Sequence, residues 1–287
     1  MSGKIVEIKR EDRRFPAALA DCIPPVEQLY CIGDTDLLKT PMAAVVGSRK
    51  CSEYGKQTAM AIGRTLSRAG ITVVSGMAKG IDNFGHQGAL RGGGKTVAVL
   101  GCGTDICYPA DNRKLYDRIA EEGLIVSEYP PGTPPMPYRF PQRNRIIAGL
   151  AKAVVIVEAG TGSGSLITAE LGEQMGRQVF AVPGNITSQW SLGTNRLIAD
   201  GAAPLVVVED LIHALGGKSI LEESSRKELS ETEQQVVRIL EEEGEVSLDY
   251  LCGRMKKNPV DMNGIVMVLE MKGYAAVNFG KIFVAKF

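Results

Sequence analysis

The sequence of 287 residues lacks the features that mark membrane and secreted proteins. No apolar run reaches the roughly 18 residues that a membrane-spanning helix needs. The amino terminus, MSGKIVEIKREDRR, is charged and has no apolar signal-peptide core. We therefore expect a cytoplasmic protein that does not contact a membrane.

Cysteines are few, and their spacing gives no metal site. The six cysteines include no Cys-x-x-Cys pair, and the closest two, Cys102 and Cys107, have no histidine nearby. A structural zinc site takes four ligands, usually in tighter pairs, and disulfides are rare in the cytosol. We expect reduced, structural thiols and no bound metal.

An excess of charge of either sign is also absent, because 33 basic residues balance 33 acidic ones. This balance argues against a protein that is basic over its whole surface. It is compatible with a local basic groove, so the distribution of charge decides whether nucleic acid binds.

Apolar side chains, at 44% of the residues, are sufficient for a full core. Short apolar segments alternate with helix-length segments, and most of the apolar segments are continuous, which indicates strands buried on both faces. Strands are expected at 43–46, 71–75, 96–100, 124–128, 153–158, 178–182 and 204–208, and helices at 53–69, 79–91, 112–122, 165–176 and 209–215. This alternation predicts an α/β fold, a doubly wound and mostly parallel sheet with helices on each face.

Composition divides the chain into four parts. Residues 1–40 are irregular and contain prolines, so we interpret them as a lead-in segment before the sheet domain of residues 41–216. The polar, glycine-led stretch 217–229 is typical of a linker. Residues 230–287 show three helical patterns followed by two strand-like halves, which predicts a small winged-helix domain.

The loop after the first predicted strand, VVGSRKCSEYG, is a candidate anion site. In open α/β sheets, ligands bind beyond the carboxyl ends of the strands. Gly47 allows close backbone approach beside Ser48, the following helix start offers free N–H groups, and Arg49 can bind a phosphate in a fork. The alternative is an ordinary turn with a solvated arginine.

The loop SGMAKGIDNFGHQGAL puts Lys79, Asp82 and His86 on one face of a predicted helix. An aspartate beside a histidine is compatible with acid–base catalysis. No serine or cysteine nucleophile is evident nearby, so we favour close packing of a glycine-rich helix start against the sheet.

A cluster of arginines and aromatic residues follows a proline-rich stretch in PPGTPPMPYRFPQRNRIIAGL. Prolines fix an extended segment, aromatic rings stack on bases of any sequence, and arginines neutralise phosphates. The residues are Tyr138, Arg139, Phe140, Arg143, Asn144 and Arg145. The alternative is that Phe140 belongs to the core and that the arginines are solvated or paired with acids.

The turn EAGTGSGSLITAE is a phosphate cradle in outline, because glycines follow a buried strand and precede a helix. Gly162, Ser163, Gly164 and Ser165 would present backbone N–H groups. A plain tight turn is nearly as good an interpretation.

Two nucleotide-binding motifs are excluded by their context. GGGKT resembles the end of a P-loop, but Lys95 and Thr96 enter a strand where that motif needs a helix. No G-x-G-x-x-G follows the first strand, so a dinucleotide is not expected. We expect no cofactor.

In combination, these loops resemble the DNA processing protein A family (DprA, also called Smf). The matching strings run in order from about residue 43 to 208: VVGSRKCSEYG, SGMAKGIDNFGHQGAL, AVLGCGTDICYPADN, SEYPPGTPPMPYRFPQRNRIIAGL, VVIVEAGTGSGSLITAE and GRQVFAVPGNITSQWSLGTNRLIADGA. The resemblance implies an extended Rossmann-like fold that binds single-stranded DNA without catalysis. It also implies a homodimer, with dimerisation near 193–205, and delivery of the strand to the RecA recombinase in natural transformation.

The resemblance also implies roles for individual residues. Arg49 would contact a phosphate, and Phe140 and Arg143 would contact the strand, with Asn144 and Arg145 beside them. The turn from Gly162 to Ser165 would supply backbone donors, and Lys79 and Lys95 would be extra cations.

Three alternatives remain open at this point. The acid-rich third part of the chain favours a partner-binding winged helix over a second DNA reader, although Lys256 and Lys257 leave the second reading open. The glycine-rich turn is faintly similar to that of nucleotide phosphoribohydrolases, in which case Glu170 would act on a ribosyl bond. A protein-interaction adaptor is the third possibility.

Overall fold

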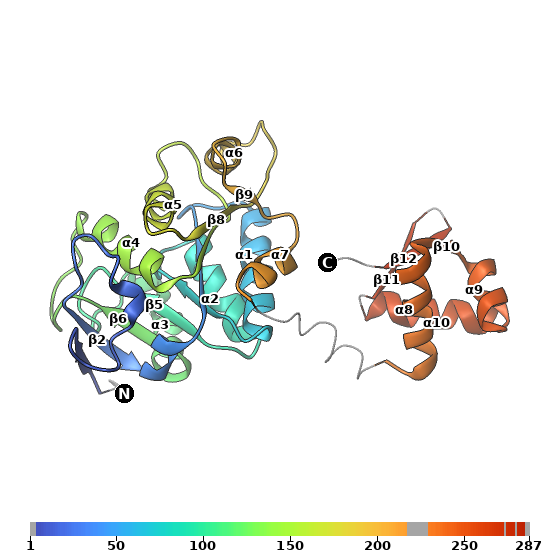
Figure 1. Cartoon of the computed structure of the whole chain (residues 1–287), viewed down its shortest axis with the longest axis horizontal. Helices are drawn as coiled ribbons and strands as arrows, with labels where there is room; N and C mark the ends of the chain where they lie inside the picture. Colours follow the sequence, from blue (N-terminus) through green and yellow to red (C-terminus); the bar gives the residue numbers. More distant parts are fainter. Residues whose placement is uncertain (1–3, 217–228, 273, 279, 285–287) are drawn as a thin grey trace. The chain divides into compact units, whose positions relative to one another are not determined.

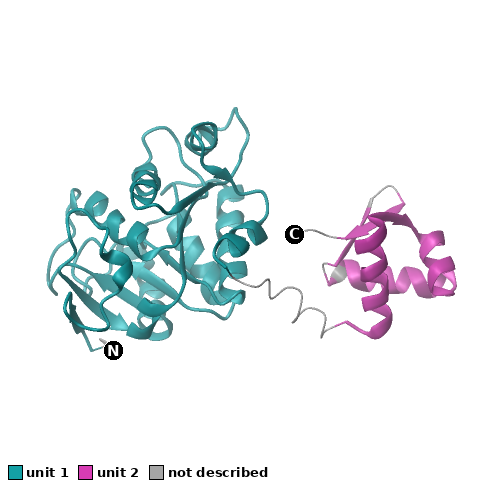
Figure 2. Ribbon diagram, viewed as in Figure 1, with its two compact units in different colours: residues 1–218 teal, residues 219–287 magenta. Residues whose placement is uncertain are grey.

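The computed structural model describes residues 4–216, 229–272, 274–278 and 280–284. The chain divides into two compact units, residues 1–218 and 219–287 (Figure 2). The linker expected at 217–229 lies outside the described residues except for its last position.

The first unit is organised around a nine-stranded sheet in the order β1-β2-β6-β5-β4-β3-β7-β8-β9 (Figure 1). The pairs from β6 across to β9 are parallel, whereas β1 with β2 and β2 with β6 are antiparallel. The strands are β1 Val6–Lys9, β2 Gln28–Gly33, β3 Met42–Val46, β4 Thr72–Ser75, β5 Thr96–Val99, β6 Leu124–Ser127, β7 Ala153–Ile156, β8 Gln178–Ala181 and β9 Ala203–Pro204.

Both faces of this sheet are buried, as its continuous apolar strands predict. Along β3, Ala44 and Val46 enter one hydrophobic core, and the intervening Ala43 and Val45 enter another on the opposite face. Helices α4 (Arg139–Leu150), α5 (Gly164–Gln174) and α6 (Leu192–Ala199) cover the first core, and α1 (Glu53–Arg68), α2 (Ile81–Arg91) and α7 (Val208–Ala214) cover the second. Helix α3 (Arg113–Glu122) packs on a third cluster beside β5 and β6, and the short 3-10 helices are η1 Ala17–Leu19, η2 Thr35–Lys39 and η3 Ala110–Asn112. The α/β, doubly wound prediction is confirmed.

The strand order reverses direction beside β3. After β3 the chain adds β4, β5 and β6 outward on one side, and β7 then returns to the other side of β3, followed by β8 and β9. The connections on the two sides of this point leave a crevice beyond the carboxyl ends of β3 and β7, which is where open α/β sheets bind ligands.

The expectation of an irregular segment at residues 1–40 is wrong. Strand β2 pairs antiparallel with β6, with Ile32 opposite Ile125, and β1 pairs with β2 at the edge of the sheet. Ile8 and Leu29 are fully buried in the core. These strands are short and lie between polar, proline-containing turns. The alternation of apolar and polar residues that would predict them is therefore weak. At the other edge, the strand β9 is only Ala203–Pro204, so of the strand expected at 204–208 only Pro204 is in the sheet, and α7 already begins at Val208.

The second unit contains three helices and a small antiparallel sheet in the order β10-β12-β11. Its elements are α8 Glu231–Glu243, β10 Glu245–Ser247, α9 Leu248–Met255, α10 Pro259–Met271, β11 Ala275–Asn278 and β12 Lys281–Val284. Helix α8 starts at a reciprocal capping box, in which Ser230 and Glu233 each bind the other's backbone N–H. Its assignment as a winged helix stays a prediction.

None of the helices in the described ranges combines the length and the apolar character that a bilayer crossing requires.

The buried His86 side chain on α2 makes the stability of the first unit pH-dependent. The hydroxyl of Thr96 donates its proton to the carbonyl of Val73 at 2.7 Å, so Nδ1 of His86, 2.7 Å from that hydroxyl, must be the donor and Nε2 is unprotonated. Burial lowers the pKa of His86 to about 3, below the value of about 6.5 in an unfolded chain. The unfolded state therefore binds more protons between these two pH values.

We expect the free energy of unfolding to fall as the pH falls from about 6.5 toward 3, with His86 contributing up to about 1.4 kcal/mol per pH unit. Urea unfolding followed by the fluorescence of Trp190, the single tryptophan, measures this in the first unit. His86→Asn should remove this part of the pH dependence, and His213→Asn, at an exposed position, should retain it. An unchanged slope in His86→Asn would contradict the assignment.

Candidate nucleic-acid interface

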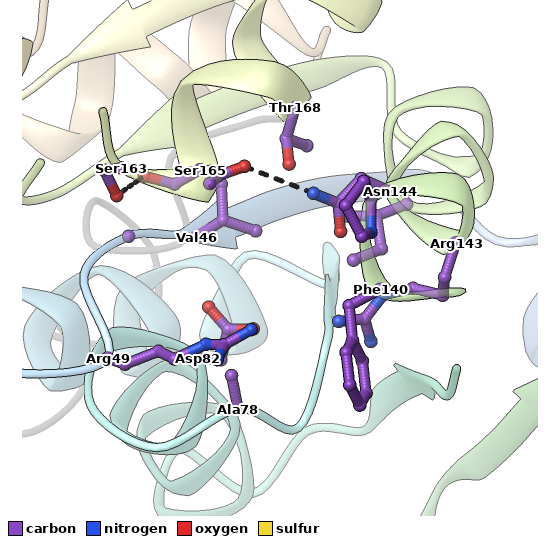
Figure 3. Close-up of a pocket in the computed structure, with 14 residues that line it drawn as sticks. Val46, Arg49, Ala78, Asp82, Phe140, Arg143, Asn144, Ser163, Ser165 and Thr168 are labelled. Carbon is purple, nitrogen blue, oxygen red and sulfur yellow. Dashed lines mark hydrogen bonds between the residues drawn. The ribbon is translucent and has the colours of Figure 1, made fainter. Parts of the chain in front are cut away.

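A pocket of about 340 Å³ lies at the carboxyl ends of the central strands (Figure 3). Its volume is in the range of sites that hold one small molecule or one nucleotide-sized group. It is lined by Val46, Gly47, Arg49, Ala78, Asp82, Phe140, Pro141, Arg143, Asn144, Ile147, Ser163, Gly164, Ser165 and Thr168.

The loop after β3 forms one side of the pocket. A side chain at Gly47 would place its Cβ 2.7 Å from Cγ1 of Ile81 and 2.8 Å from the carbonyl oxygen of Glu158, so the loop needs glycine there. The hydroxyl of Ser48 donates to the carbonyl of Lys50 at 2.6 Å. Arg49 is exposed, and its guanidinium carbon lies 5.7 Å from the centroid of the Phe140 ring. This loop therefore brings one exposed cation to the pocket.

The amino terminus of α1, expected to hold an anion, already holds one from the protein. Glu158, which is 2% exposed, accepts a hydrogen bond from the backbone N–H of Ser52 at 2.9 Å and another from the Ser52 hydroxyl. The N–H of Gly55 donates to the Ser52 hydroxyl at 3.1 Å, so an internal carboxylate and the N-cap side chain already occupy part of this helix start, and the charge of Glu158 opposes a phosphate there. This contact could not be predicted from the sequence, because Glu158 lies 106 residues from Ser52 along the chain.

The arginine and aromatic cluster forms the first turns of a helix, α4, which the sequence analysis missed. Pro141 is tolerated because it lies in the first turn, where its missing N–H would have no partner. Helical periodicity determines which of these side chains reach the pocket. Phe140, Asn144 and Ile147, at i, i+4 and i+7, lie on one face of α4 and line the pocket together with Arg143. Figure 3 shows the Phe140 ring and the Asn144 amide on this helix.

Arg143 is buried at the base of the pocket and is 5% exposed. Its Nη1 donates to the carbonyl of Gly76 at 2.7 Å and to that of Val99, which ties α4 to the ends of β4 and β5. A Cβ at Gly76 would lie 2.5 Å from Nη2 of Arg143, so only glycine leaves space for the guanidinium. Burial lowers the pKa of Arg143 to about 10, and the group stays charged at neutral pH. Arg143 is therefore a fixed positive charge beneath the pocket.

Asp82 is the carboxylate of the pocket lining, and it is also buried. It accepts a hydrogen bond from the N–H of Gly76 at 3.1 Å. Burial raises the pKa of Asp82, and the charge of Arg143 and backbone N–H groups oppose that rise. Its negative charge is thus directed into the protein and away from a ligand.

The glycine-rich turn forms the opposite side of the pocket, at the start of α5. Ser163 is the N-cap residue but makes no side-chain cap; its hydroxyl lies 2.9 Å from that of Ser165 instead. The N–H of Ser163 donates to the carbonyl of Gly160 and that of Leu166 to the carbonyl of Ser163, so within the described residues the unpaired N–H groups at this helix start are those of Gly164 and Ser165, two residues that line the pocket. The amide of Asn144 donates to the carbonyl of Gly164 at 3.2 Å, which joins α4 to this turn. Thr168, one turn further along α5, also lines the pocket and was not predicted.

Four of the predicted cations do not line the pocket. Arg145 is 4% exposed and forms two hydrogen bonds of 2.7 Å with Glu128. Arg139 lies over the rings of Tyr129 and Tyr138, with its guanidinium carbon 4.9 and 5.5 Å from their centroids.

The remaining two are the lysines. Lys79 is paired with Asp111 and precedes α2, so it does not share a helix face with Asp82 and His86 as expected. Lys95 precedes β5 and pairs with Asp34 at 2.6 Å. It therefore lies at the amino end of its strand, whereas the pocket lies at the carboxyl ends.

These features define a class of protein: a Rossmann-like α/β protein with a cationic ligand pocket at the switch point of its sheet. Comparison with known sequences gives the family. The sequence model of DNA recombination-mediator protein A matches residues 7–216, and the chain belongs to this family, whose members are called DprA or Smf.

The chain is 44% identical to the DNA processing protein DprA of Streptococcus pneumoniae over 71% of its own length and 76% of that protein. It is 38% identical to the protein Smf of Synechocystis, of which it spans 58%, and 42% identical to that of Escherichia coli, of which it spans 50%. Among solved structures, the fold matches DprA from S. pneumoniae with a TM-score of 0.71 and 42% identity, covering 73% of this chain and 74% of the other. It also matches DprA from Helicobacter pylori, described for its single-stranded DNA binding mode, with a TM-score of 0.68 and 32% identity over 75% of this chain and 98% of the other.

Because Arg145 is buried with its partner, we expect it to contribute to stability and not to contact a ligand. Arg145→Met should lower the free energy of unfolding of the first unit by about 3–5 kcal/mol, since it leaves the Glu128 carboxylate unpaired in a mostly buried site. Arg10→Met, which breaks an exposed pair with Glu27, should cost less than about 1 kcal/mol. Urea unfolding followed by Trp190 measures both. Unchanged stability together with weaker oligonucleotide binding in Arg145→Met would restore it as a strand contact.

Proposed function

We propose that this chain binds single-stranded DNA without sequence preference, with the strand gripped at the pocket between β3, α4 and α5. The observation that carries the proposal is the convergence of Arg49, the Phe140 ring and the amino terminus of α5 on one pocket. These are an exposed cation, an aromatic ring and a set of free N–H groups, which are the groups that bind phosphates and bases.

The arrangement favours a phosphate at the start of α5. The N–H groups of Gly164 and Ser165 have no backbone acceptor in the described part of the chain, and the positive end of the helix dipole adds to their effect. Arg49 is exposed and reaches the same pocket from the opposite side, and the charge of Arg143 lies below. The only carboxylate among the lining residues, Asp82, is buried and bonded to the backbone.

A single strand fits this site better than a duplex. The aromatic ring is reached only by a base that is free of its partner, and backbone phosphates alone would not require it. The site offers no set of side chains for reading base edges, so sequence selectivity is not expected.

In the family context, the chain would act as a mediator that delivers the bound strand to the RecA recombinase, as a homodimer and in natural transformation. The name of the family and the H. pylori relative's single-stranded DNA binding support the DNA-binding part of this proposal. Light scattering on the purified chain and RecA filament assembly on an oligonucleotide, with and without the chain, test the dimer and the mediator role.

The phosphoribohydrolase alternative is not favoured by the geometry. Glu170, which would have to act on the ribosyl bond, is exposed on α5, accepts from Gln174 at 3.3 Å and does not line the pocket. The same pocket lining contains no other carboxylate than the buried Asp82. We therefore propose binding without catalysis.

We expect Arg49→Ala to weaken binding of a fluorescent oligonucleotide about ten-fold at low salt, since it removes a charge-assisted contact. The slope of log affinity against log salt should become shallower by about 0.7, because one fewer phosphate is neutralised. Fluorescence anisotropy over a salt series measures both quantities.

Lys95→Ala is the matched control for this experiment. It also removes one exposed cation, but at the amino end of β5, so affinity and slope should stay at the wild-type values. Equal losses in the two variants would show that general charge, and not the pocket, determines binding. Unchanged binding in Arg49→Ala would overturn the assignment of the site.

A further inference from the structure

The loop after β5 places an exposed aromatic ring directly against the pocket residue Phe140. Tyr108 stacks on Phe140 with ring centroids 5.2 Å apart and an angle of 21° between the ring planes. Tyr108 is 44% exposed, whereas Phe140 is half-buried. The sequence analysis did not single out Tyr108, because it is far from the arginine and aromatic cluster in the chain.

Phe140 contributes to the pocket lining, but three neighbours limit the part of its ring that a base can reach. Tyr108 covers part of it, and the Arg49 guanidinium lies 5.7 Å from its centroid. The backbone of Gly101 is also close, because a Cβ there would lie only 2.9 Å from Cδ1 of Phe140. Phe140 is therefore placed to support another ring, and the more exposed ring of the stacked pair is that of Tyr108, which lies beside the pocket-lining residues.

The loop that carries Tyr108 is held in place by the neighbouring segment. The N–H of Gly103 donates to the carbonyl of Thr133 at 2.9 Å, and the N–H of Gly132 donates to the Asp105 carboxylate at 2.9 Å. The hydroxyl of Ser127 donates to the carbonyl of Cys102 at 2.6 Å. A ring on a backbone fixed in this way is oriented before a ligand arrives, which lowers the entropic cost of stacking.

We propose that Tyr108 is the base-stacking surface of the site, with Phe140 as its support, and that it receives the base next to the phosphate bound at the start of α5. This proposal rests on the proposed function, because it assigns a further subsite to the same strand. The ligand is a nucleobase of any sequence on a flexible strand, since every base has a face that can stack.

The contributions of base stacking and of phosphate contacts to the affinity can be distinguished, because only the phosphate contacts depend strongly on salt concentration. Tyr108→Leu keeps an apolar side chain but removes the ring, and it should raise the Kd for an unstructured oligonucleotide about 5- to 150-fold. It should leave the slope of log affinity against log salt unchanged, because no phosphate contact is lost. Tyr108→Phe keeps the ring and should bind within about two-fold of wild type. Tyr54→Leu removes a comparably exposed ring whose hydroxyl donates to the carbonyl of Pro183, away from the Phe140 stack, and it should have no effect.

Photocrosslinking identifies the stacked residue directly. An oligonucleotide containing 5-bromouracil, irradiated with the wild-type chain, should crosslink at Tyr108, as located by mass spectrometry of the peptides. A crosslink at Phe140 in place of Tyr108 would overturn the proposal, and so would wild-type affinity in Tyr108→Leu.

If Tyr108→Leu binds normally while Arg49→Ala is weakened, the proposed function stands and this subsite fails. If the wild-type chain does not bind the oligonucleotide at all, both fail. An unchanged urea midpoint in Tyr108→Leu, followed by Trp190, shows that the variant is folded.

Discussion

The pocket depends on one buried guanidinium. Arg143 binds the carbonyls of Gly76 and Val99 and so fixes the first turns of α4 against the ends of two neighbouring strands. The position of α4 in turn determines where Phe140 and Asn144 lie, and Asn144 connects to the start of α5. A charge removed from water needs polar partners, and the two carbonyls at the strand ends accept from Nη1 of Arg143, whereas its Nε is buried and has no partner among the described residues. The same interaction supplies the positive charge at the base of the site.

The two helix starts near the centre of the sheet differ in what they have bound. At α1, the protein supplies its own anion, the carboxylate of Glu158, which accepts from the backbone and the hydroxyl of the N-cap residue Ser52. At α5, the N-cap serine bonds to a neighbouring serine, and the N–H groups face the pocket. This difference explains how a chain without net charge presents one local site for a polyanion. The acidic groups near the site are turned inward, and the exposed group is Arg49.

Much of the fold could be predicted from the sequence, because strands buried on both faces need continuous apolar residues, as in β3 and β7. The edge strand β1 and its neighbour β2 carry only a short alternation and were missed. Within the site, the turn at Ser163–Ser165 and the residues Arg49 and Phe140 were found from glycine spacing and side-chain type. The buried positions of Arg143 and Arg145 could not be predicted. They depend on which face of α4 each residue occupies and on Glu128, which comes close to Arg145 only in the folded chain.

The glycine at position 76 has a consequence beyond this molecule. Its missing side chain makes the space that the Arg143 guanidinium occupies, although the two positions are far apart in the chain. Any larger residue at 76 would expel the arginine, and a smaller residue at 143 would leave an empty, polar hole above the glycine. In an alignment of relatives, positions 76 and 143 should therefore covary. A residue larger than glycine is expected at position 76 only in relatives that have no arginine at position 143.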